Sequence, residues 1–318
     1  MSETHAVTVG VDGSAPAIAA LDWAAQYAQA HYVPLQVLTA VGWPGERPGY
    51  GGSQLAELKE AARIDGRRTL DRALKRVRAV LPQLAVSGYV SDEPPARALL
   101  SASESSGLIV VGCRGLNPTA SVILGSVSAA LTGHAKCPVV VVRSDPRIGP
   151  TVPPAPVVVG IDGSEADEAT LGAAFAEADR RGAPLIVAHA WSDASLVGVF
   201  GAGAVPSWIE ARQHAEALLQ RQLAAWRPKY PDVRVGTVVE REQPARMLLE
   251  LGRAAGLVVV GSHGRGGFAG MRLGSVARRL LHHADAPVLV VRRGARATAH
   301  SDASQHAVPS VPAQRRGG

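Results

Sequence analysis

Two glycine-rich stretches of identical spacing are the residues of this chain best suited to chemistry. Both fit the pattern G-x2-G-x9-G-S, and each lies between an apolar run typical of a buried strand and a helical pattern. Glycines let the main chain approach an anion, and the N–H groups of a helix start point towards it. Two copies in this context predict a pair of phosphate-binding loops. The motif positions are Gly112, Gly115, Gly125 and Ser126 in the first copy, and Gly261, Gly264, Gly274 and Ser275 in the second.

An Asp-Gly-Ser turn follows an early strand pattern in each part of the chain. Asp12 lies in VTVGVDGS and Asp162 in VVVGIDGS. If the strands before the aspartate and before the glycine stretch are neighbours, the carboxylate lies opposite the phosphate loop. The alternative is that the aspartate only closes a local turn. Ser126 and Ser275 likewise have two interpretations, as helix N-caps or as phosphate ligands, and both roles use the same geometry.

A unit of about 150 residues occurs twice. Residues 112–143 align without a gap on residues 261–292, with 15 identities in 32 positions, which identifies a duplication. We define half one as residues 1–143 and half two as residues 157–293. The proline-rich stretch 144–156 is expected to be a short stiff linker, and residues 294–318 a disordered tail.

Strand and helix patterns alternate through each half. Strands that are apolar throughout and alternate with helices predict an α/β fold with a parallel sheet covered on both faces. The first helix is expected over residues 15–31, with Ser14 as N-cap and an apolar face of Ile18, Leu21, Trp23 and Ala25. Strands are expected near residues 6–11, 35–40, 84–90, 108–112 and 138–143, and near residues 157–161, 185–190, 233–239, 257–261 and 287–292.

Composition and missing motifs narrow the function classes. Apolar residues make up 47% of the chain, but no run approaches the ~20 residues of a membrane span, so we expect a soluble cytoplasmic protein. The net charge of +6 is not gathered in a stripe, which argues against nucleic acid as a partner. Cys113 and Cys137 form no disulfide or metal pattern and are interpreted as core or loop residues. No P-loop, H-E-x-x-H or G-x-S-x-G motif is present, and no strong general-base candidate stands out.

The motifs resemble those of the universal stress protein family. The resemblance rests on VGVDGS, on G-x2-G-x9-G-S, and on PVVVVR or PVLVVR, and it covers about residues 1–143 and 157–292. The double unit looks like the tandem members common in actinobacteria. The resemblance implies two Rossmann-like, adenine nucleotide alpha hydrolase-like domains, each a five-stranded parallel sheet of order 3-2-1-4-5 with helices on both faces. It also implies that the fifth strands associate, either between the two halves or between two chains in a homodimer.

The same resemblance implies ATP bound in each half. We expect no dedicated protein metal site, and Mg²⁺ only as an ion that could accompany ATP. The expected function is that of an ATP-binding, nucleotide-dependent regulator of stress or growth, acting on an unidentified protein partner. One alternative is a slow ATPase or nucleotidyl-transfer enzyme that uses the same loops. Another is a structural interaction module whose sites stay empty.

Site residues carry over from the family position by position. The adenine would meet Asp12 and Asp162 and the main chain near Val41 and Trp191, while the glycine stretches would hold the phosphates. The expected nucleotide-binding residues are Gly10, Asp12, Val41, Gly112, Arg114, Gly115, Gly125, Ser126 and Val127 in half one, and Gly160, Asp162, Trp191, Gly261, Gly264, Arg265, Gly266, Gly274, Ser275 and Val276 in half two.

The loops of the two halves differ in residues that matter for anion binding. Half two has Arg265-Gly266-Gly267 after its second motif glycine, where half one has Leu116-Asn117-Pro118. Half one thus lacks a positive charge, two glycines and one backbone donor, because proline has no N–H. We therefore hypothesise that half two holds nucleotide more tightly.

Overall fold

The computed structural model describes residues 5–42, 52–113, 124–143, 154–164, 167–191, 208–264 and 273–292. Strands and helices alternate in both halves, as the sequence patterns predict. Half one contains β1 (Val7–Gly10), α1 (Ala15–Ala30), β2 (Leu35–Ala40), α2 (Gly52–Val80), β3 (Val86–Ser91), α3 (Pro95–Ala102), β4 (Leu108–Gly112), α4 (Ser126–His134) and β5 (Val139–Val142). Half two contains β6 (Val157–Gly160), α5 (Asp167–Arg181), β7 (Leu185–Trp191), α7 (Trp208–Ala224), the short 3-10 helix η1 (Arg227–Lys229), β8 (Val235–Arg241), α8 (Pro244–Gly252), β9 (Leu257–Gly261), α9 (Ser275–His283) and β10 (Val288–Val291).

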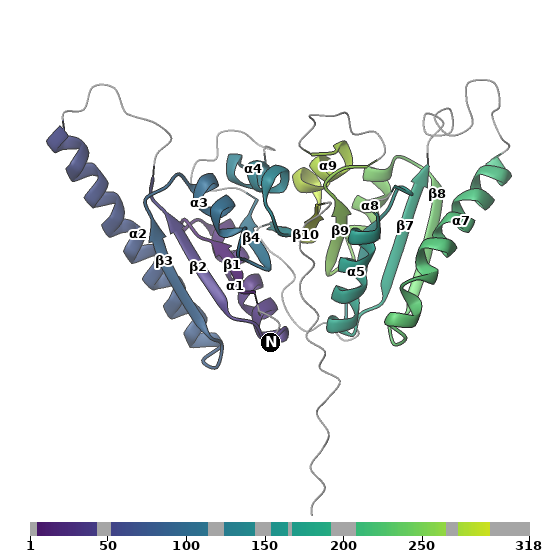
Figure 1. The fold of residues 1–318 in the computed structure, drawn as a ribbon, viewed down its shortest axis with the longest axis horizontal. Coiled ribbons are helices and arrows are strands. Elements are labelled where there is room, and N and C mark those ends of the chain that lie inside the picture. The colour runs from purple at the N-terminus through teal and green to yellow at the C-terminus, as the bar shows by residue number, and fades with distance from the viewer. Residues whose placement is uncertain are drawn as a thin grey trace, which may run out of the picture.

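The strands of each half form a parallel sheet of order 3-2-1-4-5, as the resemblance implies. The two sheets continue into one another, because β5 pairs with β10 in the antiparallel direction. The result is a ten-stranded sheet with the order β3-β2-β1-β4-β5-β10-β9-β6-β7-β8. Figure 1 shows the two halves side by side, with the long helices α2 and α7 at the outer ends.

The register of the central strand pair defines an approximate two-fold axis. Val140 pairs with Leu289, and these two residues are equivalent in the duplication, given the offset of 149 residues from Gly112 to Gly261. The flanking pairs, Val141 with Val288 and Val139 with Val290, are exchanged by the same axis. The association of halves through their fifth strands is therefore observed within one chain.

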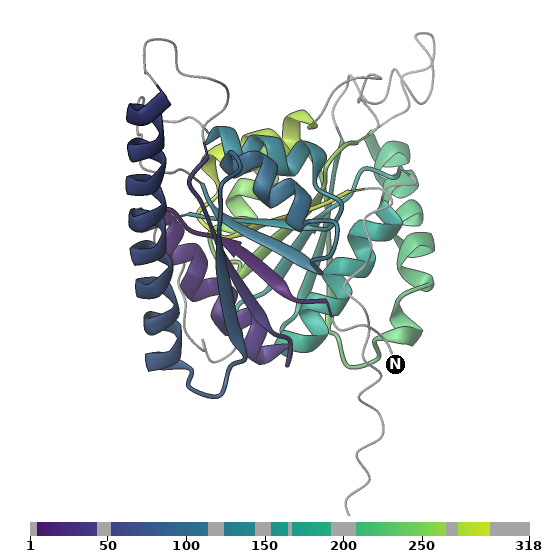
Figure 2. The ribbon, with the colours of Figure 1, turned by 60° about the vertical axis from the view of Figure 1, so that its left-hand side comes forward.

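Helices cover both faces of the sheet (Figures 1 and 2). Helices α1, α2, α5 and α7 pack on one face, and α3, α4, α8 and α9 pack on the other. Each hydrophobic core runs across both halves. Val140 of β5 faces the first core and Val141 the second, so every position of this strand is apolar and buried. Among the helices that the structure describes, none combines the length and apolar character that a membrane crossing requires.

Helix α1 begins as predicted but buries a different stripe. The Ser14 hydroxyl caps the helix by accepting a hydrogen bond from the N–H of Ala17 at 3.3 Å. The prediction for Ile18 was wrong, because its side chain is 38% exposed. The buried stripe of α1 includes Ala17, Leu21, Ala24 and Ala28, spaced by three or four residues, and position 18 lies beside it.

Among the residues of half two that the structure describes, Phe175 has the largest completely buried side chain. Its ring stacks with those of Trp226 and Tyr230 at centroid distances of 6.0 and 5.6 Å. We expect Phe175→Ala to lower the free energy of unfolding by about 3–5 kcal/mol, because the cavity cannot close fully. Urea denaturation followed by tryptophan fluorescence measures this. Ile64→Ala, at a 42% exposed position of α2, is the control and should cost about 0.5 kcal/mol or less. Equal losses of unfolding free energy in the two variants would contradict the assignment of Phe175 to the buried core.

Candidate functional site

The predicted loops emerge from neighbouring strands in both halves. In half one, β1 and β4 are paired in parallel, and in half two β6 and β9 are paired in the same register. Parallel neighbours end at the same edge of a sheet, where ligands of such folds bind. The turn that contains Asp12 and the stretch that begins at Gly112 therefore meet at one edge, as do the turn of Asp162 and the stretch from Gly261.

In half two the carboxylate lies against the glycine loop. A Cβ added to Gly264 would collide with Oδ2 of Asp162. Gly274 lies beside the same glycine, since its added Cβ would be 3.8 Å from the Gly264 nitrogen. The N–H of Gly274 donates to the carbonyl of Ser262 at 2.7 Å, which closes the base of the loop. The structure thus brings Asp162, Gly264 and the start of α9 together.

The loop of half one has the same closed base. The N–H of Gly125 donates to the carbonyl of Cys113 at 3.0 Å, at the position equivalent to the bond in half two. Arg114 and Gly115 lie outside the described residues, and so do Arg265 and Gly266. The approach of Asp12 to Gly115 therefore stays a prediction.

Glycines, and not serines, cap the helices that follow the loops. Gly125 and Gly274 are the N-cap residues of α4 and α9, with extended main-chain angles. Ser126 and Ser275 are the first helical residues and are exposed, so their interpretation as N-caps was wrong. The first-turn N–H groups of a helix have no partner within it and carry its positive dipole end.

Val127 and Val276 belong to the same first turns as these serines. Both side chains are partly buried against the core beneath α4 and α9. Only their main-chain N–H groups are suited to a polar ligand.

The two aspartates close local turns as well. Oδ1 of Asp12 accepts the N–H of Ser14 at 2.9 Å, and Oδ1 of Asp162 accepts the N–H of Ser164 at 3.0 Å. The intervening glycines have φ angles of 85° and 81°, which suits glycine alone among common residues. In half two the second oxygen of the carboxylate is the one that faces Gly264. The turn-closing role and the role at the loop therefore coexist in one side chain.

Several predicted glycines permit close packing instead of facing the loop. An added Cβ at Gly10 or Gly160 would lie 2.9 or 2.5 Å from a leucine of α3 or α8, and one at Gly112 would lie 2.6 Å from the main chain of Pro16. At Gly261 it would lie 3.2 Å from the carbonyl oxygen of His263 in the loop and 3.3 Å from Oγ1 of Thr170. Because these glycines lack a Cβ, the covering helices can approach the strand ends closely, and this packing fixes the strand ends that carry the site.

One main-chain group that follows the second strand of half one already has a hydrogen-bond partner. The N–H of Val41 donates to the carbonyl of Ser91 at 2.9 Å. Trp191 is the last residue of β7, and only its main chain is described. A ligand that contacts the main chain at Val41 would therefore use the carbonyl oxygen.

Asp167 is a site residue that the sequence reasoning missed. Its carboxylate accepts the N–H groups of Asp162 and Gly163 at 3.2 and 2.6 Å, and the side-chain amide of Gln222 at 3.1 Å. Burial raises the pKa of Asp167, the Gln222 hydrogen bond opposes this, and the charge of Asp162 adds to it. Half one has Ala17 at this position. The difference between DGSEAD and DGSAPA was the signal that could have revealed it.

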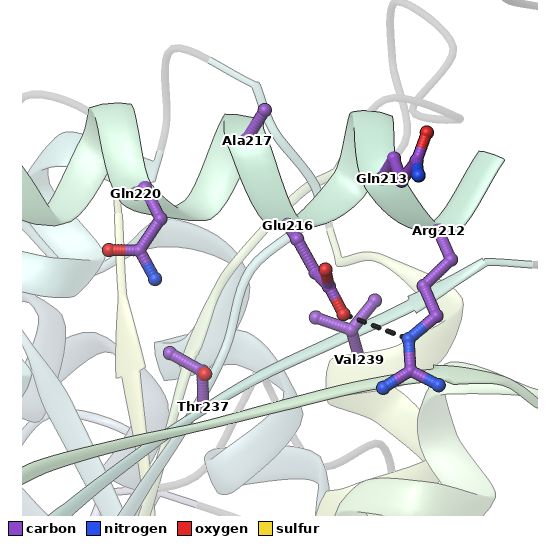
Figure 3. A pocket seen from close by; sticks show the side chains of 7 residues that line it. All are labelled: Arg212, Gln213, Glu216, Ala217, Gln220, Thr237 and Val239. Carbon is purple, nitrogen blue, oxygen red and sulfur yellow. Dashed lines mark hydrogen bonds and ion pairs between the residues drawn. The ribbon is translucent and has the colours of Figure 1, made fainter. Parts of the chain in front are cut away.

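A hollow lies away from the glycine loops. It has a volume of about 460 Å³ and lies between α7 and the edge strand β8 (Figure 3). Arg212 and Glu216 line it and form an ion pair with an N–O distance of 2.8 Å. Its lining consists of Arg212, Gln213, Glu216, Ala217, Gln220, Thr237 and Val239. None of these residues belongs to the repeated motifs, so the candidate site remains at the loops.

Cys113 and Cys137 are free and buried in the core. Burial raises the pKa of the Cys137 thiol to about 12, which keeps it protonated and unreactive. Within the described ranges, no three His, Cys, Asp or Glu side chains are grouped so as to hold a metal ion.

Comparison with known sequences identifies relatives along nearly the whole chain. A family model described as "Universal stress protein family" matches residues 3–143 and 155–292. A protein of Mycolicibacterium smegmatis named as a universal stress protein is 41% identical over 296 residues, covering 91% of this chain and 97% of that protein. A universal stress protein of Mycobacterium tuberculosis is 39% identical over 298 residues, with the same shares covered.

Solved structures agree on the fold. The crystal structure of a universal stress protein from Archaeoglobus fulgidus superimposes with a TM-score of 0.68 at 18% identity, covering 92% of this chain and 100% of that one. A functionally unknown protein of Pseudomonas aeruginosa gives a TM-score of 0.57 at 17% identity, covering 92% and 94%. With family matches in both halves and relatives of about 40% identity over nine-tenths of its length, this chain belongs to the universal stress protein family.

Proposed function

We propose that the chain binds adenine nucleotide, and ATP in particular, at the carboxyl edge of its sheet. The observation that carries the proposal is the contact of the Asp162 carboxylate with Gly264 beside the start of α9. A glycine main chain and a helix N-terminus suit phosphates, while a carboxylate oxygen accepts hydrogen bonds from an amine or hydroxyl group. An adenine nucleotide carries both kinds of group, since it joins a polyphosphate to ribose hydroxyls and an exocyclic amine.

The phosphates and the carboxylate cannot share one place without a cation, because both are negative. Asp162 would therefore contact the base or ribose, and the first-turn N–H groups of α9 with the glycine loop would hold the phosphates. Mg²⁺, if it accompanies ATP, would be bound through phosphate oxygens and at most one or two carboxylates. Asp12 and the start of α4 would form the equivalent site in half one.

We propose that ATP acts as a ligand that shifts the protein between states, and that the chain is a regulator of stress or growth. Asp167 supports this, because both of its oxygens already accept hydrogen bonds from the turn and from Gln222, so it is poorly placed to serve as a base. A bound nucleotide alters a protein's equilibrium only through its different affinity for two states. Slow hydrolysis at the same loops is the rival activity.

The direct test is to denature the purified protein and identify any released nucleotide together with its ratio to chain. We expect adenine nucleotide, or a rise in the melting temperature when ATP is added to nucleotide-free protein. Protein without nucleotide and without an ATP-dependent thermal shift would mean that the sites are empty and the proposal is wrong. Repeated turnover that is lost on replacing Asp12 or Asp162 would favour the enzyme instead.

A single methyl group tests the loop of half two. We expect Gly264→Ala to weaken ATP binding by about 10- to 100-fold, because the new Cβ meets the Asp162 carboxylate and displaces it. Isothermal titration of nucleotide-free protein measures the affinity. Gly236→Ala is a matched control, since an added Cβ there has nothing within 4 Å, and it should bind as the parent does. Unchanged affinity in a folded Gly264→Ala protein would exclude this loop.

The two sites should differ in affinity. We expect Asp162→Ala to remove the tighter of two binding events and Asp12→Ala to remove the weaker one, because only half two carries the Arg-Gly-Gly sequence and the Asp167 support. Titration of both variants with ATP, fitted with two sites, measures this. A larger loss from Asp12→Ala would reverse the assignment.

A further inference from the structure

A buried polar cluster lies between α1 and α5, where the two halves meet. The Tyr27 hydroxyl donates to Oε1 of Glu177 at 2.8 Å, and Nε2 of His31 lies 3.7 Å from the same oxygen. From its own helix, Glu177 meets Arg181 at 3.2 Å and Arg180 at 3.5 Å. The glutamate is 3% exposed, so its charge depends on these partners.

The central residues of this cluster occupy one and the same position of the repeat. The offset from Gly10 to Gly160 is 150 residues, which makes Tyr27 equivalent to Glu177. By the same offset, His31 is equivalent to Arg181. Tyr27 and Glu177 touch each other, so they lie near the two-fold axis that the β5–β10 register defines. A residue near such an axis faces its own copy when two identical surfaces pair.

Unlike halves satisfy the polar groups at this position better than like halves would. Burial alone would raise the pKa of Glu177, but the contact with His31 and the two arginine charges outweigh it and lower the pKa to about 2. If half two paired with a second half two, another Glu177 would take the place of the Tyr27 phenol and another Arg181 the place of His31, so two buried carboxylates would face each other near the axis. Like charges in a poorly solvated interface repel strongly. If half one paired with itself, two phenols would meet, and the charge-assisted hydrogen bond to a carboxylate would be replaced by a weaker one between neutral hydroxyls.

The strand pair at the centre of the interface does not distinguish the halves in this way. The paired strands read VVVV in β5 and VLVV in β10, and both are buried and apolar. Either strand could extend the edge of the other or of its own copy, because main-chain hydrogen bonds do not depend on side chains. The side chains that favour the unlike half over a second copy of the same half must therefore lie outside the strand pair, on the helices that cover it.

We propose that Tyr27 and His31 in half one, with Glu177 and Arg181 in half two, make each half's pairing surface more complementary to the other half than to its own copy. Aromatic contacts fix the geometry. The Tyr27 ring stacks on His31 at 3.7 Å, and the Arg181 guanidinium lies over the Trp23 ring at 5.8 Å. The surface thus selects one partner, the unlike half, and leaves the ten-stranded sheet as the favoured assembly.

Tyr27→Glu in the full chain reproduces the carboxylate pair that half two would meet in its own copy. We expect the melting temperature at neutral pH to fall by roughly 10 °C. It should then rise as the pH is lowered towards about 5, because a pair of facing carboxylates takes up a proton more readily in the folded state. The parent should show the opposite slope. The folded pKa of its Glu177 lies below the unfolded value, so this stability is lost as the pH falls from about 4 towards 2.

Two further variants separate complementarity from simple damage to the core. Gln29→Glu adds the same charge at an exposed position of α1 and should leave the melting temperature within about 2 °C of the parent. The reciprocal exchange combines Tyr27→Glu and His31→Arg with Glu177→Tyr and Arg181→His, and should regain most of the lost melting temperature and the parent's pH slope. An exchange variant no more stable than Tyr27→Glu overturns the proposal. The proposal is also overturned if the Tyr27→Glu protein keeps the parent's melting temperature, or if its melting temperature falls on acidification as the parent's does.

Discussion

The antiparallel pairing of β5 with β10 is the constraint on which the rest of this molecule depends. All four residues of β5 are apolar and almost completely buried, because helices cover both faces of the sheet at that point. Left open, such an edge would expose apolar side chains and unpaired main-chain groups, which is a template for aggregation. The duplication provides a partner of the same kind within the chain. Two five-stranded sheets thereby become one, and both hydrophobic cores become continuous across the halves.

Main-chain geometry, and not a set of reactive side chains, forms the candidate site. The hydrogen bond from Gly274 to Ser262 closes the loop base, and Gly264 leaves room for the Asp162 carboxylate. Asp162 uses one oxygen to close its own turn and presents the other to the loop. A frame of this kind offers a ligand main-chain N–H groups and one carboxylate acceptor. In half two the Asp167 carboxylate also accepts hydrogen bonds from the main chain of the turn, which restrains the position of Asp162.

The two halves share a frame and differ in the side chains attached to it. Ala17 occupies in half one the position of Asp167 in half two, and Tyr27 occupies the position of Glu177. The first difference alters support for one site, and the second converts a symmetric contact into a complementary one. Both changes are single residues on the first helix of a half. The sheet order, the loop bases and the capping glycines are the same in both copies. The two halves therefore differ in side chains at these positions while they keep the same fold.

The sequence by itself determined the duplication and the parallel α/β architecture, because these follow from the repeated motifs and from hydrophobic periodicity. It placed Asp162 opposite Gly264 only on the condition that their strands are neighbours. The strand order and the pairing of fifth strands were expected from the family resemblance. Only the tertiary structure decided that β5 meets β10 of the same chain, that Ile18 lies off the buried stripe, and that Asp167 and Glu177 gain partners distant in sequence. Local pattern records which residues prefer burial or a turn, whereas these outcomes depend on which surfaces meet when the chain folds.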